Sequence, residues 1–259
     1  MKPVIVPVAF GTTSKALETY NVIDEAIKQR FPEHEVRWAW SSRMVRDVMK
    51  KKGRHFPHPH EVLAELAGEG KDWAVMQSMH LICGHEFTRL LDEVHTGTPR
   101  ISVGLPLITS PEDCRWVVDA MGHLVSDRED EATLFIGHGT DHPAWTTYFA
   151  LDAMLKNTYG PGTFTGVVEG FPEAEDVVSA VKAAGFTRVK IVPLMLVAGV
   201  HYLEDLAGDE EDSWKNLFAA EGIDATLIDR GIGYMPEIVR LFIRHLEEAM
   251  DMVLESEAV

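Results

Sequence analysis

The chain is dominated by one alternating pattern. Short apolar runs rich in β-branched residues end in glycine or another small residue, and stretches of helical periodicity separate them. This alternation is typical of βαβ units that build a parallel sheet. The runs predict strands at 3–10, 35–40, 73–79 and 100–105 in the first half, and at 132–137, 164–168, 188–196 and 225–229 in the second.

The second half of the chain repeats the first at the ends of these strands. Loop-length changes in a duplicated domain produce alignments whose offset drifts in this way. The predicted fold is therefore α/β, with two similar lobes that each contain a parallel four-stranded sheet flanked by helices, and with a cleft between the lobes. The aligned positions are Phe10-Gly11-Thr12 with His138-Gly139-Thr140, Ser41 with Glu169, His85 with His201, and Pro111-Glu112 with Pro236-Glu237.

The predicted domain boundary lies beside an acidic segment. Residues 1–125 form the expected N-terminal lobe and residues 126–259 the C-terminal lobe, with "SDREDEA" (126–132) as the linker. The closing stretch "PEIVRLFIRHLEEAMDMVLE" predicts a helix long enough to pack back across the first lobe.

Charge and composition exclude several classes of protein. A formal charge of −17 disfavours nucleic acid and anionic membrane surfaces as partners, because both repel an acidic chain. No run approaches the roughly 20 apolar residues of a membrane span, and "MKPVIVPVAFGTT" is interpreted as a first strand rather than a signal peptide. We expect a cytoplasmic protein, although a processed exported protein has the same features. Cys83 and Cys114 lack CxxC spacing and are expected to be inert buried thiols.

Three polar residues follow neighbouring strands of the second half. His138, Glu169 and His201 stand at the carboxyl ends of the fifth, sixth and seventh strands, the edge at which parallel sheets bind ligands. Two imidazoles and a carboxylate suit cobalt, nickel, iron or zinc. Three protein ligands leave open coordination positions, as in sites that process something at the metal. The pattern predicts a metal site that is also catalytic.

Each of these residues also has a structural interpretation. His138 could be a hydrogen-bonded loop residue, Glu169 could solvate a turn, and His201 could cap the helix that begins at "YLEDLAG". The same ligand set also occurs in iron oxygenases, which the parallel βα pattern disfavours. The glycines beside His138 are interpreted as space for a broad, flat ligand, because they carry no side chain.

Two further segments are acidic or rich in histidine, and several further residues are candidates for substrate binding. The acidic stretch "AGDEEDSW", with Asp205 ahead of it, is interpreted as a means of concentrating cations. The segment "HFPHPH", with His55, His58 and His60, is expected to be a solvated loop, and His95 receives no role. The candidate substrate-binding residues are Phe10, Gly11, Thr12, Ser41, Arg43, Arg46, His85 and Gly139, with Lys50 as a further cation.

Several motifs resemble one enzyme family. "VAFGTTS", "FIGHGTDHPA", "TGVVEGFP", "SVGLPLI" and "PLMLVAGVHYLEDLAGDEEDSW" are similar to segments of the CbiK-type anaerobic sirohydrochlorin cobaltochelatases, over essentially the whole chain. The resemblance implies the class II chelatase fold, with His138, Glu169 and His201 as the family's site residues. It also implies ATP-independent insertion of Co²⁺ into sirohydrochlorin in cobalamin biosynthesis, no organic cofactor, and frequent homo-oligomers.

The sequence leaves alternatives open. The same residues are compatible with a protein that binds or delivers a metal or tetrapyrrole without turnover. They are also compatible with an enzyme that inserts iron to give sirohaem. Affinity alone follows the Irving–Williams order and favours nickel over cobalt, so residue types do not select the metal.

Overall fold

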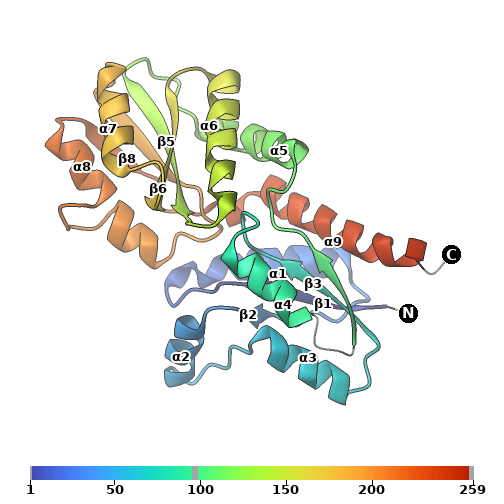
Figure 1. The fold of residues 1–259 in the computed structure, drawn as a ribbon. Helices are drawn as coiled ribbons and strands as arrows, with labels where there is room; N and C mark the ends of the chain where they lie inside the picture. The colour runs from blue at the N-terminus through green and yellow to red at the C-terminus, as the bar shows by residue number, and fades with distance from the viewer. Residues whose placement is uncertain (1, 95–98, 257–259) are drawn as a thin grey trace. The chain divides into compact units, whose positions relative to one another are not determined.

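The computed structural model describes residues 2–94 and 99–256, and the chain divides into two compact units. Unit 1 comprises Met1–Thr109 with Pro236–Val259, and unit 2 comprises Ser110–Met235. The chain therefore leaves unit 1 after its fourth strand, builds unit 2, and returns to unit 1 with its last helix (Figure 1). Within the described residues, no helix has the length and apolar character needed to cross a bilayer.

Unit 1 is built on a parallel sheet with the strand order β2-β1-β3-β4. Val6 of β1 packs in one core with Val62 and Leu66 of α3 and with Phe87 of α4, so these helices cover one face. The strands are β1 (Val4–Ala9), β2 (Ala39–Trp40), β3 (Trp73–Ser78) and β4 (Arg100–Gly104). The helices are α1 (Glu18–Arg30), α2 (Arg43–Lys51), α3 (Pro59–Gly68), α4 (His85–Val94) and α9 (Pro236–Ser256), with the short turn η1 (Lys15–Leu17).

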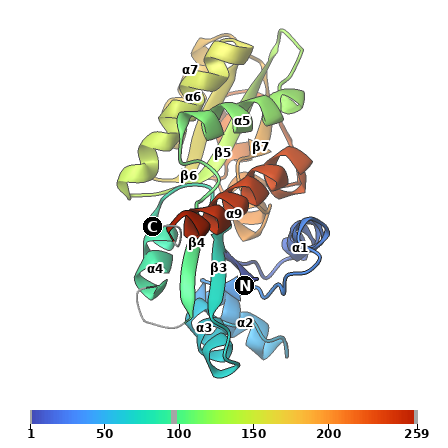
Figure 2. The same cartoon turned by 90° about the vertical axis from the view of Figure 1, so that its right-hand side faces the viewer.

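Helix α9 completes unit 1 by packing on β3 and β4 and beside α1 (Figure 2). Ile238, Leu241, Phe242 and Leu246 recur at helical spacing and are fully or almost fully buried, which gives the helix one apolar stripe. Burial of such large side chains stabilises by about 1.5–3 kcal/mol each relative to exposure. The burial of β3 and β4 in unit 1 therefore depends on residues from the C-terminal end of the chain.

Unit 2 repeats the topology, with a parallel sheet in the order β6-β5-β7-β8. Helices α5 and α6 lie on one face and α7 and α8 on the other, where Val178, Trp214 and Phe218 pack with Ile136 of β5 (Figure 1). The strands are β5 (Glu131–Gly139), β6 (Thr163–Glu169), β7 (Arg188–Pro193) and β8 (Asp224–Leu227). The helices are α5 (Pro111–Met121), α6 (Thr146–Tyr159), α7 (Ala174–Ala183) and α8 (Trp214–Ala220), with short turns η2 (Gly122–Leu124), η3 (Pro143–Trp145), η4 (Tyr202–Leu206) and η5 (Ile232–Tyr234).

The predicted α/β fold class is confirmed, because both sheets are parallel and place their first strand beside the second and third. All the predicted strands are present, although the second is shorter than expected. Val36 forms only an isolated bridge with Ile5, and regular pairing resumes at Ala39. The intervening Trp38 packs its ring against Tyr20, which separates the two stretches of pairing.

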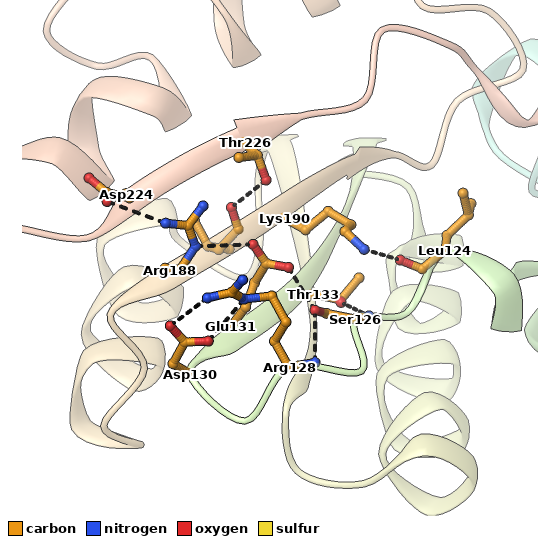
Figure 3. Close-up of polar contacts among 11 residues, drawn as sticks. Leu124, Ser126, Arg128, Asp130, Glu131, Thr133, Arg188, Lys190, Asp224 and Thr226 are labelled. Carbon is orange, nitrogen blue, oxygen red and sulfur yellow. Dashed lines mark hydrogen bonds and ion pairs between the residues drawn. The ribbon is translucent and has the colours of Figure 1, made fainter.

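The predicted linker is folded into unit 2 (Figure 3). The Ser126 hydroxyl donates to the buried Glu131 carboxylate at 2.6 Å. The Arg188 guanidinium lies 3.6 Å from Glu131 and 3.7 Å from Asp224, so it joins the starts of β5, β7 and β8. The structure accordingly divides before α5, at residue 110 and not at residue 126, because α5 packs against α6.

The central strands β1 and β5 end in the same arrangement. The Gly139 N–H donates to the Tyr148 hydroxyl at 3.1 Å, and burial raises the pKa of Tyr148. In unit 1 the Gly11 backbone hydrogen-bonds the Tyr20 hydroxyl, and burial raises the pKa of Tyr20 well above its usual range. Both glycines have positive φ, +85° and +93°, which other residues adopt at a cost.

Packing within unit 2 explains the glycines that flank His138. A Cβ at Gly137 would lie 2.2 Å from the Tyr148 ring, and a Cβ at Gly139 would lie 1.8 Å from the Glu169 carbonyl oxygen. The sequence interpretation assigned this space to a flat ligand. The structure instead fills it with the unit's own ring and backbone.

Gly139 and Gly185 form a matched pair for testing this packing. Both have positive φ, but a Cβ at Gly185 meets nothing within 4 Å. We expect Gly185→Ala to lower the free energy of unfolding by about 1 kcal/mol, the cost of the conformation alone. Gly139→Ala should cost about 3 kcal/mol or more, because the clash with the Glu169 carbonyl adds to it. Urea unfolding measures both, and equal losses would contradict the role of the close contact.

Candidate functional site

Three predicted site residues share the carboxyl edge of the unit 2 sheet. His138 is the penultimate residue of β5, Glu169 is the last residue of β6, and His201 follows β7 and precedes η4. β5 pairs with both β6 and β7, so the three positions belong to adjacent strands. His138 and Glu169 are exposed and His201 is half-buried, which leaves the edge accessible to a ligand.

The two histidines are in direct contact. The Nε2 atoms of His138 and His201 lie 3.1 Å apart, and the rings meet edge to face with centroids 4.4 Å apart. Tetrahedral coordination with metal–nitrogen bonds of 2.0–2.1 Å separates two ligand nitrogens by about 3.3 Å. The observed separation is therefore close to that of two ligands sharing one cation.

The other nitrogen of each ring fixes its tautomer. His201 Nδ1 lies 2.8 Å from the Asp205 carboxylate, and His138 Nδ1 lies 3.3 Å from the Gly139 carbonyl oxygen. A carbonyl or carboxylate oxygen only accepts, so each neutral ring carries its proton on Nδ1. Both Nε2 lone pairs then face one another, an arrangement that favours a cation or a shared proton between them.

Asp205 contacts His201, a pairing that the sequence analysis did not predict. It belongs to η4, a single π-helical turn, and stands four residues after His201. Isolated π-helical turns occur often at functional sites. A carboxylate that accepts from the second nitrogen of a ligating histidine orients the ring and raises its basicity. The spacing of four residues was a usable signal for this contact.

Glu169 stands beside the pair without joining it. Its backbone is in register with Gly139, the neighbour of His138. Within residues 2–94 and 99–256, the one group of three His, Cys, Asp or Glu ligand atoms lying within 4.8 Å of each other is His58, His60 and Glu93. The structure therefore brings His138 and His201 together and leaves the Glu169 carboxylate farther away.

An exposed aromatic pair joins α6 to the loop that follows Glu169. Phe149 of α6 and Phe171 stack in parallel with centroids 5.3 Å apart, and Trp145 contacts both rings edge to face. Phe149 and Phe171 remain 45% and 48% exposed. Large exposed aromatic faces of this kind are typical of surfaces that bind a ligand or a partner.

The predicted basic residues lie on α2 in unit 1. The Arg43 side chain is 88% exposed and only loosely paired with Asp47, at 3.9 Å. Arg46 lies 3.9 Å from Glu61. Arg46 also lines a pocket of about 340 Å³, whose other residues are Asp47, Lys50, Gly53, Arg54, His55, Phe56 and Glu61.

The remaining candidates of the first half serve varied roles. Phe10 is exposed at the end of β1, whereas Thr12 is buried. Ser41 donates its hydroxyl to the Glu86 carboxylate at 2.6 Å, and His85 begins α4. The predicted site contributions of these residues and of Gly11 stay predictions. His95 lies outside the described residues.

Two histidines of unit 1 have lowered pKa values. Burial, with a smaller contribution from Arg46, lowers the pKa of His58 to about 4. Burial lowers the pKa of His80 to about 4 as well, where Nδ1 lies 2.9 Å from the Ser78 hydroxyl. Both rings are therefore neutral near pH 7.

Comparison with curated proteins identifies close relatives. The sirohydrochlorin cobaltochelatase of Salmonella typhimurium (strain LT2) is 33% identical over 265 aligned residues, which cover 100% of both chains. The sirohydrochlorin cobaltochelatase CbiKC of Nitratidesulfovibrio vulgaris (strain Hildenborough) is 30% identical over 93% of this chain and 88% of its own.

Solved structures share the fold. The sirohydrochlorin chelatase SirB from Bacillus subtilis subspecies spizizenii, in complex with cobalt, superposes with a TM-score of 0.65 at 17% identity, covering 96% of this chain and 95% of its own. A family model described as cobalt chelatase (CbiK) matches residues 3–251. The chain, a metal chelatase, thus belongs to the CbiK cobalt chelatase family.

Proposed function

We propose that this protein inserts Co²⁺ into sirohydrochlorin during anaerobic cobalamin biosynthesis, without ATP or an organic cofactor. The observation that carries the proposal is the 3.1 Å contact between the Nε2 atoms of His138 and His201 in a member of the cobalt chelatase family. The cobalt ion is a substrate here and is bound only until the macrocycle takes it.

The histidine pair suits a metal that must be released. Two neutral imidazoles hold a borderline cation such as Co²⁺ and leave most of its coordination positions open to the pyrrole nitrogens. The Asp205 carboxylate and the Gly139 carbonyl hold the rings in place, so little reorganisation precedes binding. Loose but oriented binding is what transfer to a tetradentate acceptor requires.

Chelation also needs a group that removes the pyrrole protons. Glu169 is exposed at the end of β6, beside the strand that bears His138. As a carboxylate it accepts a proton and passes it to water, a role that requires proximity to the macrocycle and not to the metal. We assign Glu169 to proton removal in preference to direct ligation, because it stands outside the histidine pair.

Two further surfaces, one basic and one aromatic, match the chemistry of the substrate. Sirohydrochlorin carries many carboxylates, which the overall charge of −17 repels. Arg43 and Arg46 supply local positive charge and bind these carboxylates. The stacked Phe149 and Phe171 offer a flat apolar face suited to the plane of a macrocycle.

Turnover separates an enzyme from a delivery protein. We expect Co²⁺ and sirohydrochlorin to give a multiple-turnover change in the absorption spectrum with the wild-type protein. His138→Ala and His201→Ala should each lower kcat by about 10²–10⁴-fold, the range that one positioned catalytic group contributes. His123→Ala serves as the control, since His123 is an exposed histidine of the same unit whose Nδ1 lies 3.0 Å from the Ala120 carbonyl oxygen. A stoichiometric change without turnover would support metal or tetrapyrrole delivery, and faster turnover with Fe²⁺ or Ni²⁺ would reassign the metal.

Asp205 should act through His201. We expect Asp205→Ala to weaken Co²⁺ binding by about 10–100-fold, because the ring loses the acceptor that orients it. Glu204→Ala is the matched control, since Glu204 is an exposed acidic neighbour in the same turn. A Co²⁺ titration followed by visible absorption measures both variants. Similar losses in the two would indicate a general effect of negative charge.

Arg43 should affect substrate binding and not chemistry. We expect Arg43→Ala to raise KM by about tenfold, with a much smaller fall in kcat. A tenfold change corresponds to the loss of about 1.4 kcal/mol of substrate-binding free energy. Its side chain is almost fully exposed, so the fold should be unaffected. Arg240→Ala, at an exposed arginine of α9, controls for net charge. An unchanged KM for Arg43→Ala would remove this side chain from the substrate site.

A further inference from the structure

Three metal-binding side chains meet in unit 1, and none of them belongs to the proposed His138 and His201 pair. His58 precedes α3, His60 lies in its first turn, and Glu93 comes from the last turn of α4. The Nδ1 atoms of His58 and His60 are 2.6 Å apart, and His58 Nε2 lies 3.3 Å from the Glu93 carboxylate. One ligand atom from each residue lies within 4.8 Å of the other two.

The structure corrects part of the expectation of a solvated loop at "HFPHPH", because its last two residues begin α3. His58 is the N-cap residue of α3 and Pro59 its first residue, and the Glu61 carboxylate accepts from the His58 N–H at 2.6 Å. The His58 side chain is only 15% exposed and the Glu93 side chain 25%. The cluster is therefore held by the packing of α3 on α4 and does not depend on a flexible segment.

We propose that His58, His60 and Glu93 form a second metal site, which binds a divalent cation of the Zn²⁺ class. Two imidazoles and a carboxylate coordinate Zn²⁺ and similar divalent transition-metal ions. They leave at least one coordination position for water. The 3.3 Å separation between His58 Nε2 and Glu93 equals the spacing of about 3.3 Å expected for two tetrahedral ligands.

The surrounding charges favour a cation. Glu61 and Glu86 act electrostatically on His58 from the same neighbourhood, and Glu93 is itself a ligand. Arg46 and Arg89 are the opposing charges, and they are already paired with Glu61 and Glu86 respectively. Three carboxylates against two guanidiniums leave the cluster net negative, which attracts divalent ions over a few ångströms.

A bound cation would join two helices of unit 1. Its ligands come from the start of α3 and the end of α4, which are separated along the chain by β3. Binding to the folded state alone stabilises it by mass action. Occupancy of the site is therefore expected to stabilise unit 1, and the site stands independently of the proposed reaction.

The test uses the full chain with His138→Ala and His201→Ala combined, so that the proposed chelatase site does not contribute. Zn²⁺ is titrated into the metal-free protein by calorimetry, with bound zinc measured after dialysis. We expect this variant to retain a stoichiometric equivalent of Zn²⁺ and to lose it when His60→Ala or Glu93→Gln is added. His60 is exposed, so its replacement should leave the metal-free fold intact, and circular dichroism checks this.

The matched control is His55→Ala, because His55 belongs to the same histidine-rich segment but not to the cluster. We expect it to keep the bound Zn²⁺ and the rise in melting temperature that Zn²⁺ produces. Absence of a stoichiometric equivalent in the starting variant would overturn the site, as would equal zinc binding with and without His60→Ala. Neither result would bear on Co²⁺ insertion, which is measured with His138 and His201 intact.

Discussion

The orientation of two imidazole rings is the constraint on which the candidate site depends. Each ring of the His138 and His201 pair turns its Nδ1 toward an oxygen that can only accept, so both Nε2 lone pairs are directed at the same point. Two such lone pairs repel unless a positive charge lies between them. The protein thus maintains an arrangement that is unfavourable when empty and favourable when a cation enters, which is how an oriented metal site is built.

The duplicated sheets separate scaffold from chemistry. At or just after the end of β1 and of β5 stands a glycine of positive φ that is held by a buried tyrosine hydroxyl. The residue before that glycine is Phe10 in unit 1 and His138 in unit 2. The turn is therefore required by the fold in both units, whereas the imidazole is required in only one. This asymmetry is what a single reaction site in a duplicated protein should leave in the sequence.

The fold and the histidine pair could be predicted because each depends on a local pattern. Buried parallel strands appear as apolar runs, and adjacent strands bring their carboxyl ends to one edge, so the approach of His138 and His201 followed from strand order. The contact of His201 with Asp205 also had a local signal that was not used, because residues four apart lie on one face of a helical turn. The cluster of His58, His60 and Glu93 depends on the packing of α3 against α4, which periodicity does not specify. The glycines beside His138 were noticed, but their purpose is set by the Tyr148 ring and the Glu169 carbonyl, which only the structure places beside them.

The unit boundary was missed because the two repeats exchange their closing helices. α5 follows β4 of unit 1 but belongs to unit 2, and its counterpart α9 follows β8 of unit 2 but belongs to unit 1. Unit 2 is consequently one uninterrupted stretch, whereas unit 1 is assembled from both ends of the chain. During synthesis on the ribosome, the sheet of the first-made unit must wait for Ile238, Phe242 and Leu246 before its apolar face is covered. The half of the protein that is translated second is thus the first that can finish folding, and the nascent first half is the one in need of protection from aggregation.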